Sequence, residues 1–292
     1  MNDYLCGQID LLRMCLPDES GDTPKSELQN IKNYNKYCPN GDCNSEIDQI
    51  TIGFLWLLGQ YFTEYPTKDG VINYNKPFFL YIILWLSYKL NQNTEENFTK
   101  INDFYDKYVK NSNKYSNFKD GAYKILGLGE FMNKHKDLLD IDIKDLSKFY
   151  DASKLICSMY SNVAQSQTSE TLSNDATSFV QKYIDLSNKY NNESALNLQI
   201  LPALLTDYNN LNKKCRNIPP FSEIESKFSA LASEDTSSSS IGNRFFTVLS
   251  IFGAIALFLG ISYKYSLFGF RKRFQKQKLR EKIKNIKKKM NH

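Results

Sequence analysis

Histidine is scarce in this chain of 292 residues, which contains only His135 and the terminal His292. No HExxH, GxSxG or phosphate-loop motif occurs. The GLG at Gly127–Gly129 lacks the third glycine and the strand context of a dinucleotide site, so it indicates a bend or a close helix contact. These absences predict a protein that is not an enzyme, with no catalytic residues, no cofactor and no metal site.

Strand-like alternation of apolar and polar residues is nearly absent as well. Apolar residues instead recur at the spacing of one helix face, and the clearest stripe is Ile47, Ile50, Phe54, Leu57 and Tyr61. Similar stripes begin at Phe98, Leu146 and Phe179. The sequence therefore predicts an all-α fold, in which residues 1–231 form one helical domain with its own core.

The segment Pro77–Leu90 is strongly apolar but only 14 residues long. That length is too short to cross a bilayer, so it predicts a buried helix at the centre of the domain. Trp56 and Trp85 both lie in apolar runs, and we expect both side chains to be buried. The polar stretch Gln165–Asn174 predicts a connection between two long helices.

Charged side chains are missing from Phe245–Tyr263, a run of 19 residues. As a helix this run would be about 28 Å long, which matches the hydrocarbon core of a membrane. Every face of that helix would be apolar, whereas a buried helix of a soluble domain is usually apolar on one side. The run therefore predicts a single transmembrane helix, and the Ser-rich stretch 232–244 before it predicts a flexible linker.

Charge divides sharply on the two sides of this predicted span. Residues 1–243 hold 31 acidic and 24 basic residues, a net charge of −7, whereas Lys264–His292 holds 12 basic residues and one acid, a net charge of +11. The positive-inside rule places residues 264–292 in the cytosol and the large domain on the other side. The N-terminus lacks the pattern of a signal peptide, so we expect the span itself to direct insertion.

The C-terminal tail, residues 264–292, combines its net charge of +11 with an apolar stripe at helical spacing, formed by Leu279, Ile283, Ile286 and Met290. We expect the tail to form a basic helix that lies on the anionic surface of the lipid bilayer that the span crosses. The alternative is a solvated tail that only fixes the orientation of the protein in the membrane. Nucleic acid is disfavoured because the basic residues directly follow a span and lack a folded module. The residues expected to contact headgroups are Arg271, Lys272, Arg273, Lys276, Lys278, Arg280, Lys282, Lys284, Lys287, Lys288 and Lys289.

Six cysteines all precede the predicted span: Cys6, Cys15, Cys38, Cys43, Cys157 and Cys215. An even number on the non-cytosolic side predicts disulfides. Cys157 and Cys215 each end a helical run, and we expect them to be bridged.

The other four cysteines then have three possible connectivities, among which Cys6–Cys38 with Cys15–Cys43 is weakly favoured. A zinc site made of these four is a less favoured alternative, because the spacing of Cys38 and Cys43 matches no usual ligand pair. A nucleophile and base pair of Cys157 and His135 is also disfavoured relative to a disulfide.

The most specific string in the sequence is KYSLFGFRKRF at Lys264–Phe274, followed by LREKIKNIKKKMNH at Leu279–His292. Upstream of it lie CPNG at Cys38–Gly41, FLWLLGQYF at Phe54–Phe62 and YDASKLICSMY at Tyr150–Tyr160. These strings, in this order, resemble the Plasmodium interspersed repeat (PIR) variant proteins, and the start of the chain looks most like the rodent-parasite branch.

The resemblance implies a helical ectodomain, expression in blood-stage infection, and suspected roles in adhesion and immune evasion. One hypothesis is therefore a surface or exported antigen that presents a variable ectodomain to an unknown host protein or to antibody. The alternative is a structural or trafficking component that acts through its basic tail at the parasite-modified host membrane. Variation among paralogues concentrated on the ectodomain surface would favour the first.

Overall fold

The computed structural model of the protein describes residues 3–19, 22–38, 40–65, 78–112, 128–165, 169–190, 194 and 196–234. These residues form helices and no strand; the only strand-type pairing among them is an isolated bridge between Lys100 and Asp142. The predicted all-α fold is confirmed for this part of the chain. Residues Met1–Phe228 form one compact unit.

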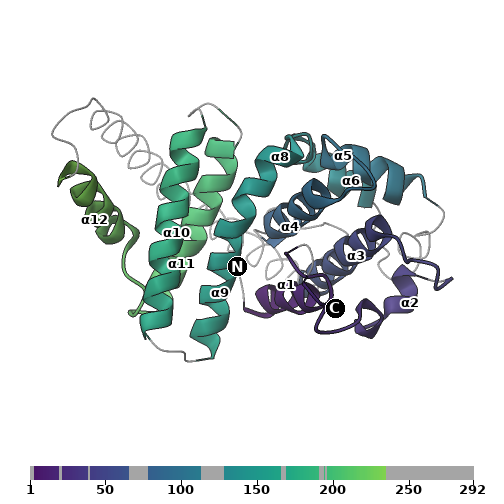
Figure 1. The fold of residues 1–292 in the computed structure, drawn as a ribbon, viewed down its shortest axis with the longest axis horizontal. Coiled ribbons are helices and arrows are strands. Elements are labelled where there is room, and N and C mark those ends of the chain that lie inside the picture. The colour runs from purple at the N-terminus through teal and green to yellow at the C-terminus, as the bar shows by residue number, and fades with distance from the viewer. Residues whose placement is uncertain are drawn as a thin grey trace, which may run out of the picture. The chain divides into compact units, whose positions relative to one another are not determined.

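The α-helices of the described residues differ widely in length, and Figure 1 labels all of them except α7. They are α1 (Asp3–Cys15), α2 (Tyr34–Tyr37), α3 (Glu46–Glu64), α4 (Phe78–Gln92), α5 (Ile101–Phe104), α6 (Leu128–Lys134), α7 (Lys136–Leu139), α8 (Ile143–Leu146), α9 (Tyr150–Ala164), α10 (Ser169–Lys189), α11 (Leu201–Lys214) and α12 (Phe221–Glu234). Short 3₁₀ turns at Leu28–Asn30 (η1) and Ser147–Phe149 (η4), and π-helical segments at Tyr105–Lys110 (η2) and Leu196–Ile200 (η5), join them.

The core is built around α3 and α4, which pack against each other and lie side by side in Figure 1. All five residues of the predicted α3 stripe are buried, and so is most of α4, as expected for a central helix. Trp56 and Trp85 are 1% and 0% exposed, which confirms their predicted burial.

Gly53 allows α3 to approach its neighbours closely. A Cβ atom at this position would lie 2.7 Å from the ring of Trp85 on α4, and 3.1 Å from the side chain of Leu12 on α1. Any larger residue would therefore overpack a junction of three helices.

Two elements flank this core. Helix α1 packs on both α3 and α9, and α9 in turn packs on α10 and α11. Figure 1 shows α9, α10 and α11 as neighbouring helices.

The predicted connection Gln165–Asn174 is wrong in its second half, because α10 already begins at Ser169. Leu172 is 2% exposed, so burial of its side chain outweighs the polar character of this stretch.

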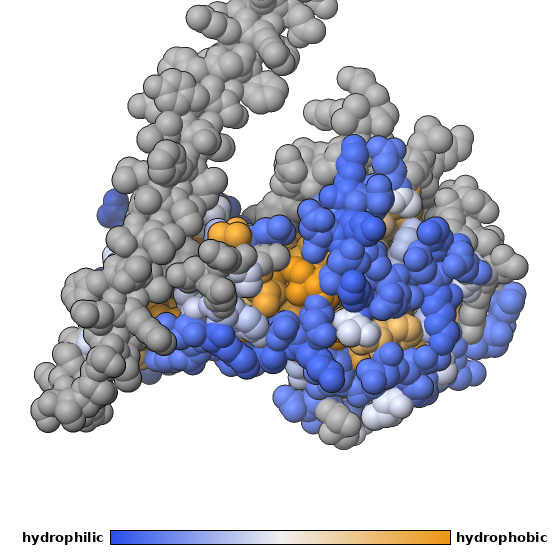
Figure 2. All heavy atoms as spheres, turned by 90° about the horizontal axis from the view of Figure 1, so that it is seen from above, coloured by the Kyte–Doolittle hydropathy of each residue, from blue (hydrophilic) through white to orange (hydrophobic). Residues whose placement is uncertain are grey.

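Figure 2 shows a surface that is largely hydrophilic where the structure describes it, with hydrophobic atoms visible between the hydrophilic areas. Within the described ranges, no helix combines the length and the apolar character needed to cross a membrane. The predicted span Phe245–Tyr263 and the predicted tail 264–292 lie outside these ranges, as does the part of the predicted linker that follows Glu234.

Candidate functional site

Cys6 on α1 and Cys157 on α9 form a disulfide whose Cα atoms are 5.0 Å apart. Both side chains are buried, at 0% and 3% exposure. The predicted bridge between Cys157 and Cys215 is therefore wrong. Helix α9 packs on α1 as well as on α11, and Cys157 faces the α1 side. Because its sulfur is in a disulfide, the disfavoured pairing of Cys157 with His135 as nucleophile and base is contradicted too.

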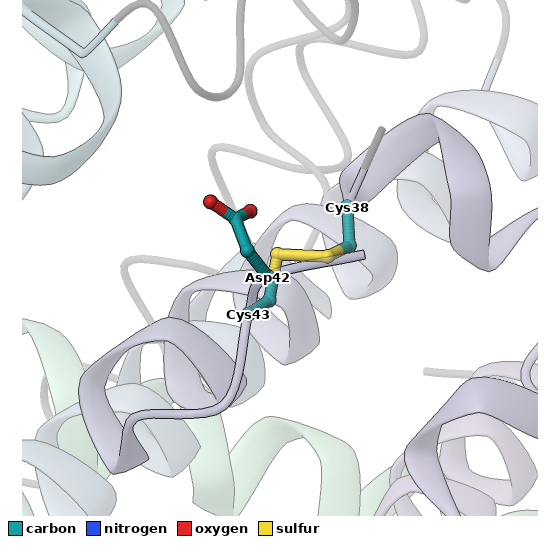
Figure 3. Close-up of side chains that lie close together, drawn as sticks. All are labelled: Cys38, Asp42 and Cys43. Carbon is teal, nitrogen blue, oxygen red and sulfur yellow. A yellow bond between two sulfur atoms is a disulfide. The ribbon is translucent and has the colours of Figure 1, made fainter. Parts of the chain in front are cut away.

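A second disulfide joins Cys38 and Cys43 within one short loop (Figure 3). Gly41 reverses the chain there: its φ of +71° lies in the left-handed region, and its amide donates a hydrogen bond of 3.3 Å to the carbonyl of Cys38. The favoured pairings Cys6–Cys38 and Cys15–Cys43 are both wrong, because this local turn already brings Cys38 and Cys43 together.

Asp42 projects from the same turn, and its carboxylate lies within 4.8 Å of both sulfurs (Figure 3). Such a cluster of two cysteines and an acid has the donor atoms of a metal site only when the sulfurs are thiolates. Here they are bonded to each other, so the cluster offers no thiolate ligand. The disulfides likewise remove Cys6, Cys38 and Cys43 from the alternative four-cysteine zinc site.

The two remaining cysteines are thiols in the structure. Cys15 is 4% exposed, and its Sγ lies 3.7 Å from the carbonyl oxygen of Glu27. Burial raises the pKa of the Cys15 thiol, which keeps it protonated and unreactive at neutral pH. Cys215 is half-buried at the C-terminal end of α11.

A cluster of charges fixes the end of α1 against α9. The carboxylate of Asp18 is only 6% exposed; it accepts hydrogen bonds from Arg13 Nε at 2.9 Å and from the Tyr150 hydroxyl at 2.9 Å, and Lys154 Nζ lies 3.3 Å away. Lys89 on α4 donates to the carbonyl oxygen of Pro17 in the same loop. Burial, and next the negative charge of Asp18, raise the pKa of Tyr150, so its hydroxyl stays a donor.

A second buried acid links α4 to α11. The Tyr81 hydroxyl donates a hydrogen bond of 2.9 Å to Asp207, which is 2% exposed. Burial raises the pKa of Asp207, and the hydrogen bond from Tyr81 opposes that shift. Each acid forms hydrogen bonds with a side chain of a different helix, so we interpret both as structural groups.

His135 packs against aromatic side chains, whereas Gly129 makes no close contact. His135 Nδ1 lies 2.8 Å from the carbonyl oxygen of Phe131, and its ring centroid is 4.4 Å from that of Phe79. A Cβ atom at Gly129 would meet nothing within 4 Å, so this glycine makes no close helix contact.

A polar pocket lies between α1, α3 and the segment that carries η1. Its volume is about 370 Å³, and we call it the α1–α3 pocket. The Tyr4 hydroxyl donates a hydrogen bond of 3.0 Å to Gln60 across it, which ties α1 to α3 at its rim. Its lining residues are Tyr4, Gln8, Leu11, Cys15, Ser26, Asn30, Ile31, Lys32, Asn33, Trp56, Gln60 and Thr63.

Sequence reasoning missed this pocket. Its polar residues come from three separate segments, and asparagine is so common in the chain, at 29 residues, that Asn30 and Asn33 do not stand out. Trp56 also lines the pocket, but the apolar residues around it in the sequence predicted a core position. The basic residues predicted to contact lipid, from Arg271 to Lys289, lie outside the described residues.

The fold and the disulfides together define the class: a disulfide-bonded all-helical domain. The family model for the Plasmodium variant antigen proteins Cir/Yir/Bir matches residues 6–264. This chain belongs to that family of variant antigens.

Among solved structures, the chain is similar to the structure of a Plasmodium PIR protein ectodomain, with 28% sequence identity and a TM-score of 0.60. The match covers 75% of this chain and 95% of that one. A search of the curated proteins found no match. The PIR resemblance inferred from the strings in the sequence is therefore confirmed by two independent comparisons.

Proposed function

We propose that this variant antigen displays its helical domain outside the cytosol for contact with host cells or antibody, and that it is not an enzyme. In this proposal Phe245–Tyr263 crosses the membrane once, and residues 264–292 lie in the cytosol. The site of display is the surface of the infected host cell or of the parasite. Display of a variable domain there would serve immune evasion.

The observation that carries this proposal is membership of a variant antigen family over residues 6–264. The Cys6–Cys157 disulfide supports a non-cytosolic location, because buried disulfides between distant helices are typical of oxidising compartments. The net charge of −7 on residues 1–243 and of +11 on residues 264–292 supports the orientation.

Surface proteolysis of intact infected red cells tests the proposal. Antibodies against the ectodomain and against the tail 264–292 serve as readouts. We expect the ectodomain signal to be lost while a tail fragment stays protected. Loss of the tail signal with retention of the ectodomain would reverse the orientation. Protection of both, with cleavage of both after permeabilisation, would contradict display on the surface of the infected red cell.

The +11 tail favours a second candidate function, as a structural or trafficking component that binds anionic lipid at the parasite-modified host membrane. Deletion of the ectodomain separates the two. The tail function would survive this deletion, whereas host contact by the ectodomain would be lost.

A further inference from the structure

We propose that the α1–α3 pocket binds the terminal acidic sugar of a glycan. This inference rests on the proposed host contact for the source of the ligand, but the site itself is argued from the pocket. Its volume of about 370 Å³ lies in the lower part of the range of small-ligand sites, which is about 300–1,000 Å³. That size suits a mono- or disaccharide.

Hydrogen-bonding groups in the pocket are unused. The side chains of Gln8, Asn30 and Asn33 make no hydrogen bond within the described part of the chain, although each amide offers both donors and acceptors. Sugar hydroxyls also donate and accept, so neutral amides from separate segments match their chemistry. Asn33 adopts a left-handed backbone conformation with φ of +65°, which asparagine tolerates better than most residues.

Aromatic surface in the pocket comes from Tyr4, whose side chain is 46% exposed. An exposed aromatic ring of this kind can pack against the apolar face of a sugar ring. Trp56 also lines the pocket, but its side chain is only 1% exposed, so it closes the α3 side of the site and offers no open face to a ligand.

The charges favour an acidic sugar over a neutral one. Of the described residues that line the pocket, Lys32 is the only cation and none carries a carboxylate. Within the same part of the chain Lys32 forms no ion pair, so its ammonium is available to a ligand carboxylate. A charge-assisted hydrogen bond there would be stronger than a neutral one.

Binding is tested with the purified full-length chain in detergent, using 3′-sialyllactose and lactose as probes. The chain has only two tryptophans, so a Trp85→Phe variant leaves Trp56 as the single tryptophan reporter. We expect saturable quenching or a spectral shift with 3′-sialyllactose, and weaker binding of lactose. A complete absence of saturable binding of 3′-sialyllactose to the wild-type protein, measured by calorimetry, would overturn the proposal.

Matched variants locate the site. Asn30→Ala and Gln8→Ala should each weaken binding at least about fivefold, through loss of a hydrogen bond. Gln29→Ala, next to Asn30 but outside the pocket, should leave affinity unchanged. Lys32→Ala should remove the preference for 3′-sialyllactose over lactose, whereas Lys36→Ala should not. Equal effects of the pocket variants and their controls, with unchanged circular dichroism, would contradict the assignment.

Cell binding separates this inference from the proposed function. If the full-length chain binds red cells and neuraminidase treatment abolishes this binding, the acidic sugar is supported. Loss on trypsin-treated cells would then assign the sugar to glycoproteins, and retention would assign it to glycolipids. If binding persists after neuraminidase and in the Asn30→Ala variant, host contact stands while the glycan site is wrong.

Discussion

The two disulfides of the described chain differ in what they join. Cys6–Cys157 spans 151 positions and fixes α1 to α9 inside the core, whereas Cys38–Cys43 spans five positions and closes one loop. In the chain-entropy model, the longer loop is worth about 5 kcal/mol and the shorter about 2 kcal/mol. The first therefore holds the domain together, and the second shapes a local turn.

The difference also shows how the protein can combine a rigid core with changeable loops. The α1–α9 junction is held by the disulfide and by the Asp18 cluster, both buried. The segment between α1 and α3 contains the separate Cys38–Cys43 disulfide and carries exposed polar residues such as Asn30 and Lys32. Substitutions at exposed positions such as Asn30 and Lys32, which are remote in sequence from Asp18, would leave the junction unchanged.

Removal of the long-range disulfide should have the largest effect. A Cys6→Ala/Cys157→Ala variant of the oxidised fragment 1–234 should lose about 5 kcal/mol of unfolding free energy, with further loss from the cavity. Urea denaturation followed by circular dichroism measures this change. Cys215→Ser, at a half-buried thiol, is the matched control and should change stability by less than about 0.5 kcal/mol. Equal unfolding free energies of the double variant and the control would show that the Cys6–Cys157 disulfide does not stabilise the domain.

Loss of the Asp18 carboxylate should come next. Asp18→Ala leaves the Tyr150 hydroxyl without its acceptor and removes one of two carboxylate partners from Arg13 and from Lys154, which should cost about 2–3 kcal/mol. This loss is smaller than that for a fully buried pair, because the Arg13 side chain is 37% exposed. Asp10→Ala removes only the exposed partner of Arg13 and should cost less than about 0.5 kcal/mol. Thermal unfolding of the two variants side by side would reject the buried cluster if their losses were similar.

The local disulfide should have a smaller and more confined effect. Cys38→Ala/Cys43→Ala should lower the unfolding free energy by about 2 kcal/mol. Hydrogen exchange should increase for residues 38–43 and remain unchanged in α9. Faster exchange throughout α9 would show that the short loop supports the core, which would break the comparison between the two disulfides.

The smallest effect concerns pH, to which neither disulfide responds directly. The pKa of Asp207 is raised in the folded protein, so its contribution favours folding at acid pH. That contribution declines as pH rises from the unfolded pKa, about 4, through the folded pKa. The Asp207→Asn variant should not show this loss of stability with rising pH. Its stability relative to the wild type should therefore increase from acid pH toward neutral pH. Parallel stability curves for wild type and Asp207→Asn between pH 4 and 7 would contradict the shift.

The sequence was sufficient for the helices but not for their contacts. The stripe from Ile47 to Tyr61 and the apolar run before Leu90 predicted α3 and α4, because burial of one or all faces leaves a pattern in neighbouring residues. Cys157 had two helical neighbours available, α1 and α11, and no local pattern distinguishes them. The left-handed backbone conformation of Gly41, which lets Cys38 reach Cys43, is visible only in the structure. The α1–α3 pocket was missed for the same reason, since Gln8, Asn30 and Trp56 meet only after folding.

Peptide mapping without reduction tests the central claim most directly. The full-length chain is denatured without reduction, its free thiols are alkylated, and it is then digested with protease. The digest should contain one linked peptide pair with Cys6 and Cys157, a disulfide between Cys38 and Cys43, and the alkylating reagent on Cys15 and Cys215. A linked pair of Cys157 with Cys215, or alkylation of Cys6, would contradict the assignment of the Cys6–Cys157 disulfide.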